Sequence, residues 1–166
     1  MVAVKEASGN IEQLAVISRD RPRDVAVLAG DDAAALAVLA MGGDGVVSVA
    51  SNEIPRQVAA MCSAACAGDW AGARRIHERW LPLFRANFQG GPNPVPAKAA
   101  LVAMGVLERD DLRAPLLPLA DAPRERLVGL LRSMGLLDGG GRQSTPGSAR
   151  PRATVRRART ADGVPA

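Results

Sequence analysis

Several residue types are scarce in this 166-residue sequence, and each shortage excludes a class of protein. No apolar run reaches about 18 residues and no basic-then-apolar leader is present, so the sequence predicts neither a membrane-spanning helix nor secretion. Cys62 and Cys66 have no cluster of Cys or His near them, and His77 is the only histidine. The sequence therefore predicts two buried, reduced thiols, no metal site and a cytoplasmic protein.

Lysine is also scarce, because 19 of the 21 basic residues are arginines and only Lys5 and Lys98 are lysines. The net charge of +4 comes from segment 138–166, which holds six arginines and two acids. This segment is rich in Gly, Pro, Ser and Thr and has no periodicity, so it is predicted to be disordered. Its arginines are scattered and lack interleaved aromatics, so we expect them to be solvated, with nucleic-acid binding as a less favoured alternative.

Three short apolar runs alternate with helical patterns in the first 67 residues. The runs cover residues 2–5, 25–29 and 45–49, and the helical patterns cover 11–21, 33–41 and about 53–67. The order βαβαβα with short connections predicts a parallel sheet with right-handed crossovers, in a (β/α) barrel or a doubly wound sheet. Asn10 and Asp32 are the predicted N-caps of the first two helices.

Residues 68–137 contain only helical patterns, over about 69–88, 97–104 and 123–134. All four aromatic side chains of the chain recur at helical spacing in the first of these: Trp70, Trp80, Phe84 and Phe88. A stripe of this kind predicts core packing rather than a ligand site.

Lys5 ends the first apolar run, immediately before a loop of small and polar residues. Ligands bind at the carboxyl ends of parallel strands in α/β proteins. A lysine shielded from water at that place is more often neutral, so it can attack a carbonyl. The alternative is an ordinary lysine with its ammonium in solvent or paired with Glu6. The scarcity of lysine in an arginine-rich chain counts against this alternative.

Four stretches occur in a characteristic order: Val-Ala-Val-Lys-Glu-Ala-Ser-Gly-Asn (2–10), Ala-Gly-Asp-Asp-Ala (29–33), Gly-Gly-Asp-Gly-Val-Val-Ser-Val (42–49) and Pro-Asn-Pro-Val-Pro-Ala-Lys (92–98). Together they resemble the carboxyl-terminal half of the 4-hydroxy-tetrahydrodipicolinate (dihydrodipicolinate) synthases, which are pyruvate-dependent class I aldolases related to N-acetylneuraminate lyase. The resemblance implies an α/β fold, in which residues 1–67 form the last three units of a (β/α)8 TIM barrel. Residues 68–137 would form a carboxyl-terminal helical domain, followed by the tail 138–166.

The same resemblance assigns roles to individual residues. Lys5 would form a Schiff base with pyruvate, Val47 would turn its backbone carbonyl toward that lysine, and Gly30 would lie on the neighbouring strand end. The resulting enamine would attack aspartate semialdehyde in lysine and diaminopimelate synthesis, with no cofactor besides the imine on Lys5. The alternatives are core packing for Val47 and a turn for Gly30, while Asp31 and Asp32 are expected to be structural or capping.

The sequence departs from this family in what it lacks. The family's proton relay uses tyrosines and a threonine, whereas this chain has no tyrosine and all its threonines lie in 138–166. Five of eight βα units are missing and Met1 directly precedes the lysine strand, so we expect a truncated product, a split half or a wrongly assigned start. Alone it should be weakly active or inactive, because three barrel strands leave open edges. We expect it to need an N-terminal half-barrel partner or a homo-oligomer; the alternative is a non-catalytic fragment or subunit that docks on a full-length family member.

Overall fold

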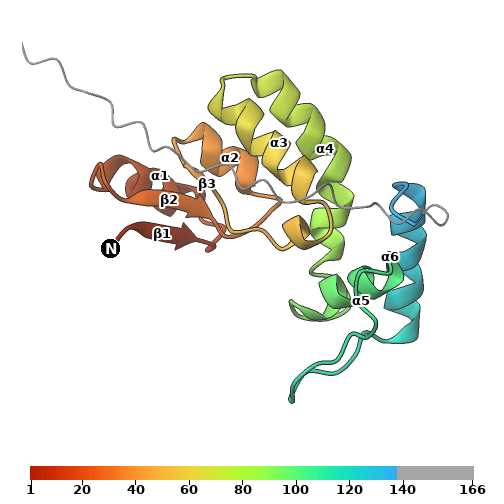
Figure 1. Ribbon diagram of the computed structural model, residues 1–166. Helices are drawn as coiled ribbons and strands as arrows, with labels where there is room; N and C mark the ends of the chain where they lie inside the picture. Colours follow the sequence, from red (N-terminus) through yellow and green to blue (C-terminus); the bar gives the residue numbers. More distant parts are fainter. Residues whose placement is uncertain (138–166) are drawn as a thin grey trace, which may run out of the picture.

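The computed structural model describes residues 1–137, and its first part is a small parallel sheet covered by helices. The strands β1 (Ala3–Glu6), β2 (Ala26–Ala29) and β3 (Gly45–Val46) pair in the order β1-β2-β3, both pairs parallel. The crossovers are α1 (Ile11–Asp20) and α2 (Ala35–Ala40). The predicted parallel α/β sheet is thus confirmed, and Figure 1 shows its strands beside the layer of helices.

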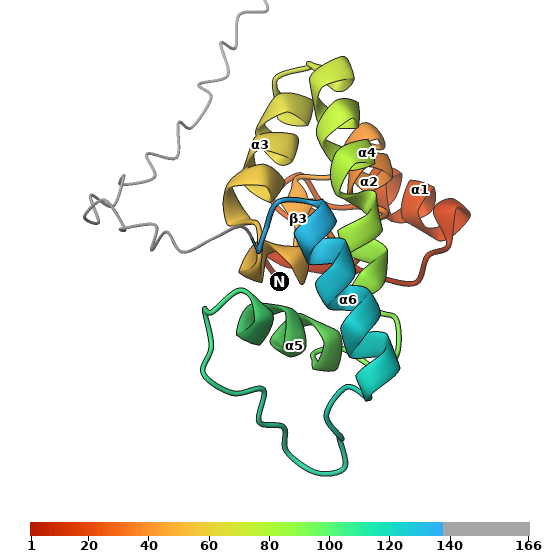
Figure 2. The same cartoon turned by 90° about the vertical axis from the view of Figure 1, so that its right-hand side faces the viewer.

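Up to residue 137, four further α-helices follow the sheet. After β3, a 3-10 turn η1 (Ala50–Asn52) leads into α3 (Pro55–Cys66), which packs against the long helix α4 (Trp70–Ala86). The helices α5 (Val95–Ala103) and α6 (Asp121–Ser133) lie at the far end of α4, joined by the long connection that projects in Figure 2. Within residues 1–137, none of the helices has the length and apolar character needed to cross a bilayer.

Side-chain caps begin two of the helices. Asn10 accepts a hydrogen bond from the backbone of Gln13 and caps α1, as predicted. Asp69 does the same for α4, where its Oδ1 accepts from the backbone N–H of Gly72 at 2.8 Å. Such caps satisfy backbone donors that the first turn of a helix leaves free, so these boundaries are encoded locally.

One core connects the sheet to the later helices. It contains buried side chains from α1, β2, α3, α4 and α6, among them Leu14, Val27, Met61, Phe84 and Leu131. This core holds β2 under the helices, because apolar groups that interdigitate in this way gain most from exclusion of water. The position of β2 then fixes its two neighbours in the sheet.

Two burial predictions are wrong in part. Trp80 and Phe84 are buried, but Trp70 and Phe88 are 43% and 46% exposed, because Trp70 is the first residue of α4 and Phe88 follows its end. Cys66 is exposed as the last residue of α3, and only Cys62 is partly buried. Residues 138–166, with their predicted disorder and scattered arginines, lie outside the described part of the chain.

Candidate functional site

The three residues predicted to form the site share one face of the sheet. The register pairs Lys5 with Leu28 and Leu28 with Gly45. Side chains alternate along a strand and paired residues point the same way, so the next positions on this face are Gly30 and Val47. The carboxyl ends of β1, β2 and β3 therefore place Lys5, Gly30 and Val47 on the same face of the sheet.

The opposite face of the sheet is the one covered by helices. Val27 and Ala29 on that face are fully buried. Glu6 also points that way, and its Oε1 accepts hydrogen bonds from the backbone of Ser8 at 2.9 Å and from the amide of Gln13 on α1 at 3.4 Å. The bonds from Ser8 lower the pKa of Glu6. The alternative pairing of Lys5 with Glu6 is wrong, because this carboxylate is directed to α1 and no ion pair joins the two residues.

The side chain of Lys5 lies directly against Gly30. A Cβ atom added to Gly30 would lie 2.8 Å from Cε of Lys5, 2.4 Å from Cβ of Ala7 and 3.0 Å from the carbonyl oxygen of Glu6. Gly30 does not have a positive φ, so this glycine is required by the close approach of Lys5 and not by a left-handed turn. Its backbone N–H donates to the carbonyl of Glu6 at 2.6 Å, which holds the two strand ends together.

Replacing Gly30 by alanine should displace the lysine. The new methyl group would collide with Ala7 and with Cε of Lys5, so we expect a loss of about 1–3 kcal/mol in the free energy of unfolding. Urea denaturation of wild type and Gly30→Ala measures the difference. Gly129→Ala is the matched control, because nothing lies within 4 Å of a Cβ at that helical position. An equal stability of the Gly30→Ala variant and wild type would contradict the close contact.

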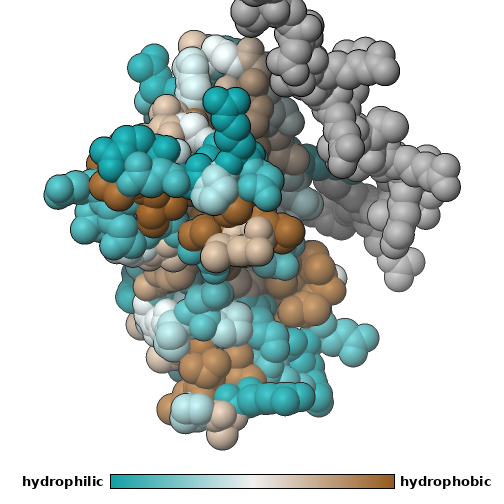
Figure 3. Space-filling model, turned by 90° about the vertical axis from the view of Figure 1, so that its left-hand side faces the viewer, coloured by the Kyte–Doolittle hydropathy of each residue, from teal (hydrophilic) through white to brown (hydrophobic). Residues whose placement is uncertain are grey.

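This face of the sheet is open to solvent. Lys5 is exposed and Val47 is 44% exposed, so the expected shielding of the lysine and the alternative of Val47 as a core residue are both wrong for the described chain. The reason is that β1 is an edge strand and neither a strand nor a helix of residues 1–137 covers this face. Figure 3 views the molecule from the side of β1 and shows hydrophobic patches interrupted by hydrophilic side chains.

The two aspartates after β2 are both structural, but Asp32 is not the helix cap that was predicted. Asp31 Oδ1 accepts from the backbone of Ala33 at 2.7 Å and Ala34 at 3.3 Å, so it holds the turn that enters α2. Asp32, predicted as the cap, instead accepts from the backbone of Val49 at 2.9 Å and Ala50 at 3.0 Å. These bonds turn the chain away from the sheet, which explains why β3 ends at residue 46 and not at 49 as predicted.

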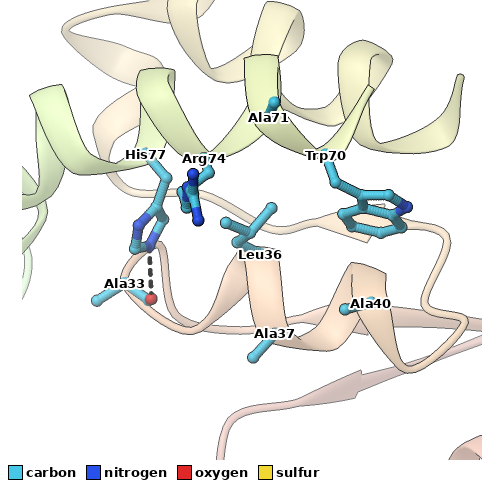
Figure 4. A pocket seen from close by; sticks show the side chains of 8 residues that line it. All are labelled: Ala33, Leu36, Ala37, Ala40, Trp70, Ala71, Arg74 and His77. Atoms are coloured by element: carbon cyan, nitrogen blue, oxygen red, sulfur yellow. Dashed lines mark hydrogen bonds between the residues drawn. The ribbon is translucent and has the colours of Figure 1, made fainter. Parts of the chain in front are cut away.

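His77 anchors the same loop from the helical layer. Its Nε2 donates to the carbonyl of Ala33 at 2.8 Å, from α4 across to the start of α2 (Figure 4). The groove there, about 540 Å³ in volume, is walled mainly by alanines, Leu36 and Trp70, and contains none of the three predicted site residues. The described residues include no cluster of three or more His, Cys, Asp or Glu able to hold a metal ion.

A buried acid near this loop was missed by sequence reasoning. Glu53 is only 6% exposed, and its Oε2 accepts a hydrogen bond from the amide nitrogen of Asn87 at 2.9 Å. Burial raises the pKa of Glu53 to about 7; the bond from Asn87 opposes this rise and the negative charge of Asp32 adds to it. No local pattern signals this pair, because its two members are far apart in sequence.

Comparison with known proteins places these residues in a family context. Residues 1–134 match the model of the dihydrodipicolinate synthetase family. A 4-hydroxy-tetrahydrodipicolinate synthase of Koribacter versatilis is 44% identical over 137 residues, which are 82% of this chain and 45% of that protein. The chain spans about half the length of the curated relatives it matches.

Solved structures agree with the sequence relatives. Dihydrodipicolinate synthase from Aquifex aeolicus superposes with a TM-score of 0.79 at 34% identity, over 82% of this chain and 46% of that one. The chloride-inhibited enzyme from Acinetobacter baumannii, complexed with pyruvate, gives a TM-score of 0.77 at 32% identity, with the same coverage. Because the family model matches most of the chain and both fold and sequence agree, the chain belongs to the dihydrodipicolinate synthetase family.

Proposed function

We propose that this chain is the Schiff-base-forming sector of a 4-hydroxy-tetrahydrodipicolinate synthase. In this proposal β1, β2 and β3 are the last three strands of a (β/α)8 barrel, residues 1–67 belong to the barrel and residues 68–137 form its helical domain. The observation that carries the proposal is the position of Lys5, whose side chain lies over Gly30 on the face of the sheet away from the helices. In a closed barrel this face would be the interior.

The proposed chemistry needs an amine at this place. The neutral amine of Lys5 attacks the ketone carbon of pyruvate, and loss of water gives an iminium ion. The iminium accepts the electron pair left when a methyl proton departs, so an enamine forms. The enamine carbon attacks the aldehyde of aspartate semialdehyde, and the product leaves as it cyclises and frees Lys5. Gly30 leaves room for the lysine, and the carbonyl of Val47 is proposed to face the imine.

The chain alone lacks parts of this machinery. It has no tyrosine, and residues 1–137 contain no threonine, so proton transfers must rely on groups from elsewhere. Among residues 1–137 nothing pairs with the outer edge of β1, and beside it lies a groove of about 540 Å³, whose lining includes Val4, Val16 and Val25. We propose that a chain carrying the other barrel units, or a full-length relative, packs at this edge. A non-catalytic docking subunit remains the second candidate, favoured by the same open edge.

The test is reduction of the full chain with borohydride in the presence of pyruvate. We expect a pyruvate-derived mass on the peptide that carries Lys5, because borohydride reduces an imine to a stable amine. Synthase turnover of the isolated chain should lie at least about 10²–10⁴-fold below that of an intact relative, since general acid and base groups are missing. An adduct confined to Lys98, no adduct in folded protein, or full turnover would each refute the proposal.

A further inference from the structure

Three buried polar side chains lie in the loops and helix end that follow the proposed site. Asp32 comes from the loop after β2, Glu53 from the turn before α3 and Asn87 from the end of α4. Each is at most 6% exposed. We call them the acid cluster. Glu53 and Asn87 are joined by a hydrogen bond, and Asp32 acts on Glu53 through its charge.

When both acids are ionised, the acid cluster has more buried hydrogen-bond acceptors than donors. Each member has one oxygen that is buried and has no partner in the described chain: Oδ1 of Asp32, Oε1 of Glu53 and Oδ1 of Asn87. All three atoms are acceptors, and buried acceptors without donors are rare because each loses its bonds to water. One proton on Glu53 turns its Oε1 from an acceptor into a donor, so two buried acceptors rather than three are left without a donor.

No cation of the described chain takes the place of that proton. The ion pairs within residues 1–137 involve neither Asp32 nor Glu53. On α3, the thiol of Cys62 is another titratable group near Asp32. The pKa of this thiol is raised, mainly by burial and further by the charges of Cys66 and Asp32. From α4, His77 bonds the carbonyl of Ala33, the residue after Asp32.

The acid cluster connects the loops that carry two of the three site residues. Asp32 follows Gly30 by two positions, and it holds the backbone of Val49, which follows Val47 by two. Through Glu53 and Asn87 the same cluster is tied to the end of α4. A change in its charge therefore acts on the loops at the ends of β2 and β3, beside the Lys5 strand.

We propose that Glu53 is a positioning residue: while it is a neutral carboxylic acid, Asp32 holds together the two loops behind Gly30 and Val47, and ionisation of Glu53 beside Asp32 loosens them. The family's own chemistry at Lys5 does not require this role. The effect on Lys5 rests on the proposed function, whereas the loosening of the loops does not.

Hydrogen exchange tests the loosening without any substrate. The amides of Val49 and Ala50 donate to Asp32, so their protection factors report on the acid cluster directly. Between pH 6 and pH 8.5 we expect protection of these amides to fall about tenfold in wild type and to stay constant in Glu53→Gln, whose amide cannot ionise. Glu125→Gln, a change of the same kind at an exposed site on α6, should follow wild type.

Pyruvate trapping by borohydride then tests the link to Lys5. The trapping rate of Glu53→Gln divided by that of wild type should be near one at pH 6 and several-fold higher at pH 8.5. Equal protection factors in the two proteins at both pH values would overturn the loosening, and a flat trapping ratio would overturn the positioning role. If no protein forms an adduct at any pH while protection still differs, the proposed function fails and the loosening stands.

Discussion

Replacement of Lys5 by arginine is expected to reduce the borohydride-trapped pyruvate adduct to background while the protein stays folded. A guanidinium keeps its proton at all accessible pH values, so it offers no neutral amine to the ketone of pyruvate. The side chain of Lys5 is exposed, so the free energy of unfolding should change by less than about 0.5 kcal/mol. Intact-mass spectrometry after reduction, with circular dichroism as the check on folding, measures both quantities.

The chain provides its own matched control, because Lys98 is the only other lysine. Lys98 lies on α5, and its Nζ donates to the backbone carbonyl of Asp111 in the connection that follows this helix. Lys98→Arg removes the same kind of amine at a place far along the chain and should retain the adduct. If Lys98→Arg lost the adduct and Lys5→Arg kept it, the assignment of Lys5 would be wrong.

The second large effect concerns stability, and we expect Glu53→Gln to be more stable than wild type at alkaline pH by about 3 kcal/mol. The pKa of Glu53 rises from its ordinary value of 4.5 to about 7 in the folded protein, mainly because burial penalises the charged carboxylate. An acid with a raised pKa binds its proton more tightly when folded. Its contribution to stability is full below about pH 4.5 and is lost as the pH rises through about 7.

Glutamine at this position is isosteric and never ionises, so the two proteins should have similar stability at pH 4. The difference between them should grow from about pH 5 and level off above about pH 8. The carboxylates whose pKa is lowered, such as Glu6 and Asp44, give the opposite trend in both proteins and cancel in the difference. Urea denaturation at a series of pH values measures the difference, and a gap that does not change with pH would disprove the assignment.

Local sequence patterns predicted most of the sheet and the place of Lys5 in it. The alternation of short apolar runs with helical periodicity was enough to predict β1, α1, β2 and their parallel order. The cap at Asn10 was predicted because its partner lies only three residues away. The position of Lys5 at a strand end followed from the same pattern, whereas the place of Gly30 beside it was expected only from the family resemblance.

Features that depend on distant partners were not predictable in this way. The backbone N–H of Val49 donates to Asp32, and this bond shortens β3. The sequence of the run 45–49 contains no signal for it. Glu53 looked like an ordinary helix start, because its partner Asn87 lies at the far end of α4. Trp70 has the helical spacing of a core residue, yet only the packing of neighbouring elements decides that this end of α4 is exposed.

The order of the strands in the sheet bears on how the chain folds. Each strand pairs with the next one along the chain, Ala3 with Ala26 and Leu28 with Gly45, so no pairing waits for a remote segment. Loop closure over these separations costs less entropy than closure over the whole chain. The Lys5 strand therefore finds its partner close by along the chain, whereas the core that holds β2 is completed only by the later helices α3, α4 and α6.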